Sequence, residues 1–262
     1  MAGKLPTTGA RRAGTETGPV RRRVAGGAPS TDLVFTAHVG GNADVFPQIL
    51  GLYVPRGAVV ADVTFGNGTF WKHVPTGEYT LLASDLSTRN RRSPHIEVKG
   101  GIDCRELPYD DGSIDCVVLD PPYMEGLHRR DEGHLAGSGS HAPFRRHYSG
   151  GTPTAGGPRW HDAVVGLYVA AGLEAHRVLR KDGVLVVKCQ DEVSANTQRL
   201  THVEVITGYE SIGFHTRDLF VVVRTNRAGV SRLKKQAHAR KNHSYFLVFE
   251  KRRSRVSSVV SI

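Results

Sequence analysis

Four aspartates in the first half of the chain, at positions 62, 85, 103 and 120, each lie at the end of a short apolar run or just after it. Asp62 precedes the turn Gly66-Asn67-Gly68, where the missing side chains let a ligand approach the backbone. Asp85 follows about 20 residues after the turn, a distance that suits a carboxylate binding ribose hydroxyls. Asp103 could accept a hydrogen bond from an adenine amino group. Each aspartate alone is typical of a turn or helix cap, but the repeated position indicates a ligand site.

The glycine turn is incomplete as a dinucleotide-binding motif. The pattern G-x-G-x-x-G needs a third glycine at the position where this chain has Trp71. A nicotinamide-dependent oxidoreductase is therefore disfavoured. For Trp71 itself, core or lid packing is favoured over stacking on a base.

Apolar and β-branched runs predict the elements that position these residues. Strands are predicted at 58–63, 80–84, 95–99, 114–119, 184–188, 216–224 and 243–251. Helical spacing of apolar residues predicts helices at 44–54 and 162–179. Strands that alternate with helices predict an α/β, Rossmann-like fold with a mostly parallel, seven-stranded sheet and helices on both faces. The last two strands have no convincing helix between them and predict an antiparallel edge pair. In such a sheet, ligands bind at the carboxyl ends of the strands.

Charge is divided unevenly along the chain, whose total is +10. Residues 1–31 carry +5, residues 32–223 carry −5, and residues 224–262 carry +10. An acidic body between two basic ends suggests that the protein meets a polyanion.

The same composition predicts the domain organisation. Residues 1–31 have almost no large apolar side chains, so we predict a disordered basic tail. One domain is expected over 32–251, followed by a C-terminal tail at 252–262. Within the domain, residues 124–161 show no sustained periodicity and predict a long mobile loop that could contact the target.

The residues Asp120-Pro121-Pro122-Tyr123 follow the fourth predicted strand. They match the signature (D/N/S)-P-P-(Y/F/W), and here the sequence resembles the amino-methyltransferases. These class I S-adenosylmethionine enzymes methylate exocyclic amino groups of nucleic-acid bases. Their cofactor turn, D-x-F-x-G-x-G, is similar to residues 62–68, although Phe65 comes one residue late. The resemblance covers about residues 37–251 without the 124–161 segment, and implies the class I methyltransferase fold.

The resemblance also implies roles for individual residues. The Asp120 carboxylate and the Pro121 carbonyl would accept hydrogen bonds from the target amino group, and Pro122 would help to stiffen this segment. Tyr123 would stack on a base flipped out of its duplex. The implied cofactor is S-adenosylmethionine, with the contact residues Phe46, Asp62, Thr64, Phe65, Gly66, Gly68, Asp85 and Asp103.

Basic residues in two segments predict phosphate contacts that do not depend on base sequence. They are Arg129, Arg130, Arg145 and Arg146 in the long loop, and Lys234, Lys235, Arg240 and Lys241 in the connection between the last two strands. A merely solvated insertion or face is the alternative in each case. The histidines of the loop are irregularly spaced and have no cysteine partners, so no metal site is predicted.

The favoured activity is methylation of adenine N6 in DNA, because DPPY is commoner among the adenine enzymes of the family. Cytosine N4 in DNA, whose enzymes usually carry SPPY, stays open, as does an amino group of a tRNA or rRNA base. A non-enzymatic nucleic-acid-binding protein with a degenerate methyltransferase fold is a further alternative. The intact Asp120–Tyr123 segment disfavours it.

The compartment is predicted from cysteine usage and hydropathy. The three cysteines, Cys104, Cys116 and Cys189, are widely spaced and form no CxxC pair. This favours a reducing compartment, and we expect the cytoplasm. No apolar run approaches the ~20 residues that a membrane-spanning helix needs, so no membrane association is expected.

Overall fold

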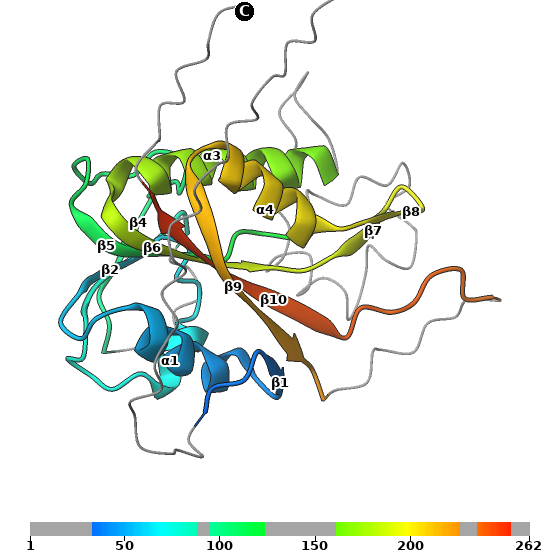
Figure 1. Cartoon of the computed structure of the whole chain (residues 1–262), viewed down its shortest axis with the longest axis horizontal. Helices are drawn as coiled ribbons and strands as arrows, with labels where there is room; N and C mark the ends of the chain where they lie inside the picture. Colours follow the sequence, from blue (N-terminus) through cyan, green and yellow to red (C-terminus); the bar gives the residue numbers. More distant parts are fainter. Residues whose placement is uncertain (1–32, 88–94, 124–160, 226–234, 253–262) are drawn as a thin grey trace, which may run out of the picture. The chain divides into compact units, whose positions relative to one another are not determined.

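An eight-stranded sheet lies at the centre of the computed structural model (Figure 1). The strand order is β1-β9-β10-β6-β5-β2-β3-β4, and only β10 runs antiparallel to its neighbours. The strands are β1 (Ala37–Val39), β2 (Val59–Asp62), β3 (Thr80–Asp85), β4 (Val98–Gly100), β5 (Ile114–Leu119), β6 (Leu179–Cys189), β9 (Phe214–Val223) and β10 (His243–Lys251). The predicted α/β fold with a mostly parallel sheet and an antiparallel pair is confirmed.

The eighth strand, β1, is the one that the sequence did not predict. It has three residues and pairs in parallel with β9, with His38 opposite Val222. The amide of Val221 also donates to the carbonyl of Thr36 at 2.7 Å. The antiparallel β9–β10 pair therefore lies one strand in from the edge of the sheet. Such a short segment carries too little apolar pattern to be recognised from sequence alone.

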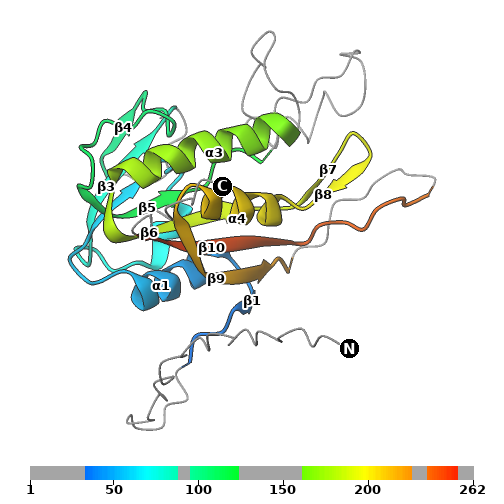
Figure 2. The same ribbon diagram turned by 45° about the horizontal axis from the view of Figure 1, so that its top comes forward.

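Helices cover both faces of the sheet, as predicted (Figure 2). One face carries α1 (Asn42–Tyr53) and the short 3₁₀ helix η1 (Thr69–His73), and the other carries α3 (His161–Val178) and α4 (Thr201–Ser211). A separate hairpin consists of β7 (Glu192–Ser194) and β8 (Thr197–Arg199). The α4 helix was not predicted, because it buries only Thr201, Val205 and Tyr209 and leaves Val203 exposed.

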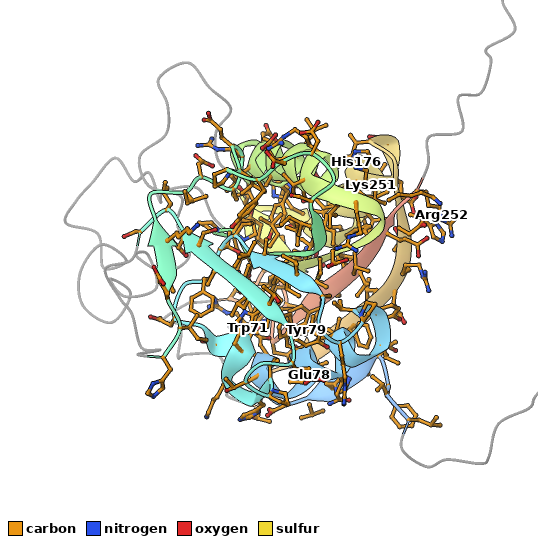
Figure 3. All side chains as sticks on the ribbon, turned by 90° about the vertical axis from the view of Figure 1, so that its left-hand side faces the viewer. Trp71, Glu78, Tyr79, His176, Lys251 and Arg252 are labelled. Atoms are coloured by element: carbon orange, nitrogen blue, oxygen red, sulfur yellow. The ribbon has the colours of Figure 1, made fainter. Side chains whose placement is uncertain are left out.

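Two apolar clusters fill the space between the sheet and its helices. Successive strand residues point to opposite faces, so Val118 belongs to the cluster under α1 and Leu119 to the cluster under α3. Figure 3 shows the same division, with Trp71 on the α1 side and His176 on the α3 side. The inner strands are buried on both faces, so their sequences are continuous apolar runs. These runs are the pattern from which the strands were predicted.

The structure describes residues 33–87, 95–123, 161–225 and 235–252. Nearly all of them belong to one compact unit, Val34–Ile262. The predicted basic tail, residues 124–160 of the predicted mobile loop and nearly all of the predicted 252–262 tail lie outside the described residues. His161, the last residue of that predicted loop, is buried and begins α3 instead. Within the described part, no helix combines the length and apolar character that crossing a membrane would require.

Candidate active site at the carboxyl edge of the sheet

Four neighbouring strands bring the four aspartates to one edge of the sheet. Asp120 follows β5, Asp62 ends β2, Asp85 ends β3, and Asp103 lies three residues beyond the end of β4. These strands are adjacent in the order β5-β2-β3-β4 and all run parallel. Their carboxyl ends therefore meet at the edge where ligands bind in open α/β sheets.

Asp85 holds the glycine turn in place. Its carboxylate accepts hydrogen bonds from the amide of Gly66 at 2.8 Å and from the amide of Ser87 at 2.9 Å. Gly66 and Gly68 have φ angles of 54° and 68°, a region that favours glycine. In the described part of the chain, the buried Asn67 Oδ1 has no hydrogen-bond partner. The turn thus offers an open backbone and a vacant acceptor to a ligand.

Asp62 is fixed beneath the turn and is 2% exposed. The indole Nε1 of Trp71 donates to its Oδ2 at 2.7 Å, and the amide of Thr64 donates to its Oδ1 at 3.2 Å. Burial raises the pKa of Asp62 to about 7, and the nearby negative charges of Asp120 and Asp85 act in the same direction. Trp71 itself packs in the core, 5.3 Å from the ring of Phe46, so its predicted core packing is confirmed.

The Asp120–Tyr123 segment starts where β5 ends and is hydrogen-bonded to Thr64, two residues before the glycine turn. The amide of Asp120 donates to Thr64 Oγ1 at 2.6 Å. The Tyr123 hydroxyl donates to Asp120 Oδ1 at 2.5 Å. Pro121 is buried and Pro122 is partly buried, so the segment is held on a packed base. Burial raises the pKa of the Asp120 carboxyl above its ordinary value, while the hydrogen bond from Tyr123 opposes the shift.

Three residues predicted to contact a cofactor make other contacts in the structure. Phe46 is 0% exposed and packs against Phe70, with ring centroids 5.2 Å apart. Phe65 is 5% exposed and lies in the same apolar cluster. The Asp103 carboxylate accepts from Arg105 Nε at 3.0 Å and from Nη2 at 2.6 Å, and this pairing lowers the pKa of Asp103. Phe46 and Phe65 therefore make the contacts of core residues, and Asp103 has a charged partner already.

The basic connection reaches the same edge of the sheet. Because β10 is antiparallel, its first residue, His243, lies opposite Val223 near the carboxyl end of β9. Lys235 and Arg240, which precede β10, are exposed, and Lys241 is partly exposed. The other cations predicted to bind nucleic acid, Arg129, Arg130, Arg145, Arg146 and Lys234, lie outside the described residues.

Comparison with protein families gives this site its context. A family model described as DNA methylase, of the N6/N4 type, matches residues 114–260, more than half of the chain. The chain belongs to this DNA methylase family. The match begins at β5 and includes the Asp120–Tyr123 segment, while the glycine turn precedes it. The resemblance to S-adenosylmethionine-dependent amino-methyltransferases is thereby confirmed.

Solved structures similar to this DNA methylase share little sequence with it. A Thermus thermophilus protein described as a DNA modification methylase, in complex with S-adenosyl-L-methionine, has 17% identity and a TM-score of 0.36, over 57% of this chain and 53% of that chain. TrmN from Thermus thermophilus has 16% identity and a TM-score of 0.46, over 80% of this chain and 50% of that chain. An S-adenosylmethionine-dependent methyltransferase from Methanosarcina mazei has 11% identity and a TM-score of 0.46, over 78% of this chain and 97% of that chain.

These likenesses are distant, so the family assignment depends on the family model. The chain spans about half the length of the two Thermus proteins. No curated protein matches the sequence.

One residue of this DNA methylase that sequence reasoning missed, Lys188, lies next to Asp120 on the neighbouring strand. Lys188, near the end of β6, is 0% exposed, and its Nζ donates to the buried Ser244 Oγ at 2.7 Å. The only sequence signal was a lysine within the apolar run of β6. Its position beside Asp120 follows from strand pairing, which is not visible in the sequence.

Proposed function

We propose that this protein transfers a methyl group from S-adenosylmethionine to an exocyclic amino group of a nucleic-acid base, with adenine N6 in DNA as its target. The observation that carries the proposal is the position of Asp120 at the carboxyl edge, hydrogen-bonded through its amide at 2.6 Å to Thr64, which lies two residues before the glycine turn. A cofactor on the turn and an amine on Asp120 would thus be neighbours. The aspartate that begins the motif supports adenine, following the family resemblance.

The residues around the turn fit the proposed cofactor. S-adenosylmethionine, when bound, supplies an electrophilic methyl group on a cationic sulfonium. Carboxylates at the strand ends favour a cation, and Asp85 lies where ribose hydroxyls would be expected. The vacant acceptor Asn67 Oδ1 could receive a hydrogen bond from a cofactor amino or hydroxyl group. A bound cation would also favour the ionised form of Asp62, whose pKa of about 7 lies close to neutral pH.

Asp120 would prepare the amino group for attack. The lone pair of an exocyclic amine is delocalised into the base ring, which makes the nitrogen a poor nucleophile. Hydrogen bonds from its two hydrogens to the Asp120 carboxylate and the Pro121 carbonyl would favour a more tetrahedral nitrogen. Transfer would form a nitrogen–carbon bond and break the sulfur–carbon bond of the cofactor, releasing neutral S-adenosylhomocysteine, and the methylated nitrogen would pass its extra proton to water. The rigid proline segment keeps both acceptors at a fixed spacing.

We further propose that the partner is nucleic acid, DNA rather than RNA, and that the protein acts in the cytoplasm. The basic residues at the carboxyl edge support a polyanionic partner. Cys104, Cys116 and Cys189 are all free and buried. Unpaired thiols are typical of a reducing compartment.

The proposal is tested by following the transfer of a labelled methyl group from S-adenosylmethionine to duplex DNA, single-stranded DNA and bulk RNA. The modified polymer is then digested to nucleosides. We expect N6-methyladenine in DNA. N4-methylcytosine, or label in RNA alone, would contradict the proposed target. Nucleic-acid binding without transfer, together with no cofactor binding by calorimetry, would instead favour the non-enzymatic alternative.

The exposed cations before β10 should determine how nucleic-acid binding depends on salt. Replacing Lys235, Arg240 and Lys241 by alanine should weaken duplex binding and reduce the slope of log K against log salt by up to about 2.7, because each phosphate contact contributes about 0.9. Calorimetry should show unchanged cofactor affinity. A matched variant removes Arg56 and Lys181, exposed cations near the amino ends of β2 and β6. An equal loss of slope per charge in both variants would contradict a nucleic-acid surface at the carboxyl edge.

A further inference from the structure

Lys188 is the only lysine or arginine with a buried side chain among the described residues. Transfer of an ammonium group from water to a protein interior is costly unless the charge is compensated. A methionine or leucine would fill the same volume on β6 without this cost. The lysine therefore needs an explanation in terms of charge.

The direct contacts of the ammonium group are neutral. Lys188 Nζ donates to Ser244 Oγ at 2.7 Å and lies over the ring of Phe246, 4.1 Å from its centroid. Phe246 is itself fixed by the ring of Phe70, with centroids 5.1 Å apart. In the part of the chain that the structure describes, no carboxylate forms an ion pair with Nζ. The hydroxyl and the ring hold the ammonium in place and leave its charge without a direct counter-ion.

Strand pairing places Lys188 beside Asp120. In the parallel pair of β5 and β6, Leu119 lies opposite Val187. The next residues along the two strands are Asp120 and Lys188, so these two also lie next to each other. Leu119 and Val187 both belong to the cluster under α3, and alternation directs the following side chains toward α1. The carboxylate and the ammonium therefore share one face at the end of two adjacent strands.

The two groups influence each other electrostatically. Burial is the largest cause of the raised pKa of Asp120 and of the lowered pKa of Lys188. The ammonium of Lys188 lowers the pKa of Asp120, and the carboxylate of Asp120 raises that of Lys188. Arg224, just beyond the end of β9, lowers the pKa of both groups, and the buried Cys189 raises the pKa of Lys188. The negative charge of Asp120 also raises the pKa of Asp62 at the end of β2.

We propose that Lys188 is a positioning residue for methyl transfer, whose buried ammonium keeps the Asp120 carboxylate ionised and able to accept a hydrogen bond from the target amine. The inference rests on the proposed function of Asp120. A protonated carboxyl group would present a donor where the amine needs an acceptor. Burial at the end of β5 favours that protonated form, and a fixed cation opposes it. Ser244 and Phe246 serve by holding the cation there.

The Lys188→Met variant tests this role through the pH dependence of the reaction. Without the ammonium, the pKa of Asp120 rises further. The acid limb of the pH–rate profile, where the rate falls as Asp120 is protonated, should therefore move to higher pH by about one unit. The single-turnover rate should fall about tenfold at about pH 5 and less than about threefold at about pH 9. Ser244→Ala removes the hydrogen bond but keeps the charge and its contact with the Phe246 ring, so the pH profile of this variant should shift much less than that of Lys188→Met. A uniform loss of rate in Lys188→Met, with an unmoved acid limb, would overturn the proposal.

A second measurement needs no enzymatic activity. Carbon-13 NMR of labelled wild-type protein should show Lys188 still charged at every pH at which Asp120 passes from acid to carboxylate. A neutral Lys188 in that range would overturn the proposal. The proposed function is tested independently of this role: it is wrong if the wild-type protein transfers no methyl group to any nucleic acid. In that case the NMR titrations of the wild type and of Lys188→Met still decide whether Lys188 controls Asp120.

Discussion

Replacing Asp120 by alanine should lower the methyl-transfer rate constant by at least about 10²–10³-fold and leave cofactor affinity nearly unchanged. The substitution removes the acceptor that we assign to the target amine. It leaves the hydrogen bond between the backbone amide of residue 120 and Thr64 Oγ1, because that bond does not involve the carboxylate. The glycine turn should therefore keep its shape. Single-turnover transfer to duplex DNA and calorimetry with S-adenosylmethionine measure the two effects separately.

Asp120→Asn is the matched control for this variant. It keeps the shape and one acceptor oxygen but loses the charge, so its activity should lie between those of the alanine variant and the wild type. The thermal stability of both variants should be measured as well, because loss of the Asp120 charge leaves the buried ammonium of Lys188 without its neighbouring negative charge. Wild-type rates in Asp120→Ala would refute the assigned role of the carboxylate.

Truncating Tyr123 should have the second largest effect. Tyr123→Ala removes the ring that we expect to stack on the flipped base, and stacking on an aromatic side chain contributes about 1–3 kcal/mol per base. It also removes the 2.5 Å hydrogen bond to Asp120, which favours the ionised carboxylate. We expect a decrease of about 100-fold in kcat/KM for duplex DNA. The expected change in cofactor affinity is small.

Tyr123→Phe separates the two contributions, because it keeps the ring and removes only the hydroxyl. Its kcat/KM should fall less than about tenfold, with an acid limb displaced toward higher pH, since the lost hydrogen bond no longer stabilises the carboxylate. Steady-state kinetics at several pH values measure both. Equal losses in the phenylalanine and alanine variants would show that the hydroxyl, and not the ring, accounts for the effect.

Much of the fold could be predicted from local pattern. The β5 and β10 strands have the predicted boundaries, because buried strands are continuous apolar runs bounded by polar residues. The α1 and α3 helices were recognised by the helical spacing of their apolar residues. The β1 strand, the β7–β8 hairpin and α4 were missed. Each is short or buries few side chains, so the pattern that reveals burial is weak there.

The candidate site was predicted less completely than the fold. The order of each strand and its following aspartate along the chain is enough to place Asp62, Asp85 and Asp120 at strand ends. The contacts of those carboxylates do not follow from that order. Asp85 accepts a hydrogen bond from the amide of Gly66 in the glycine turn, and Asp62 accepts one from the indole of Trp71. Phe46 resembled a cofactor contact, yet its ring lies in the core because α1 directs it between η1 and the sheet.

The sequence by itself determined which residues end the strands, since apolar runs, the glycine turn and the Asp120–Tyr123 segment are local features. Only the tertiary structure decided which strand ends are neighbours. Lys188 lies beside Asp120 because β5 and β6 pair in a given register, and Ser244 reaches Lys188 because β10 enters antiparallel. Register depends on packing between segments that are distant in the chain, so no local pattern carries it. The identity of the acceptor was thus visible in the sequence, and its electrostatic environment was not.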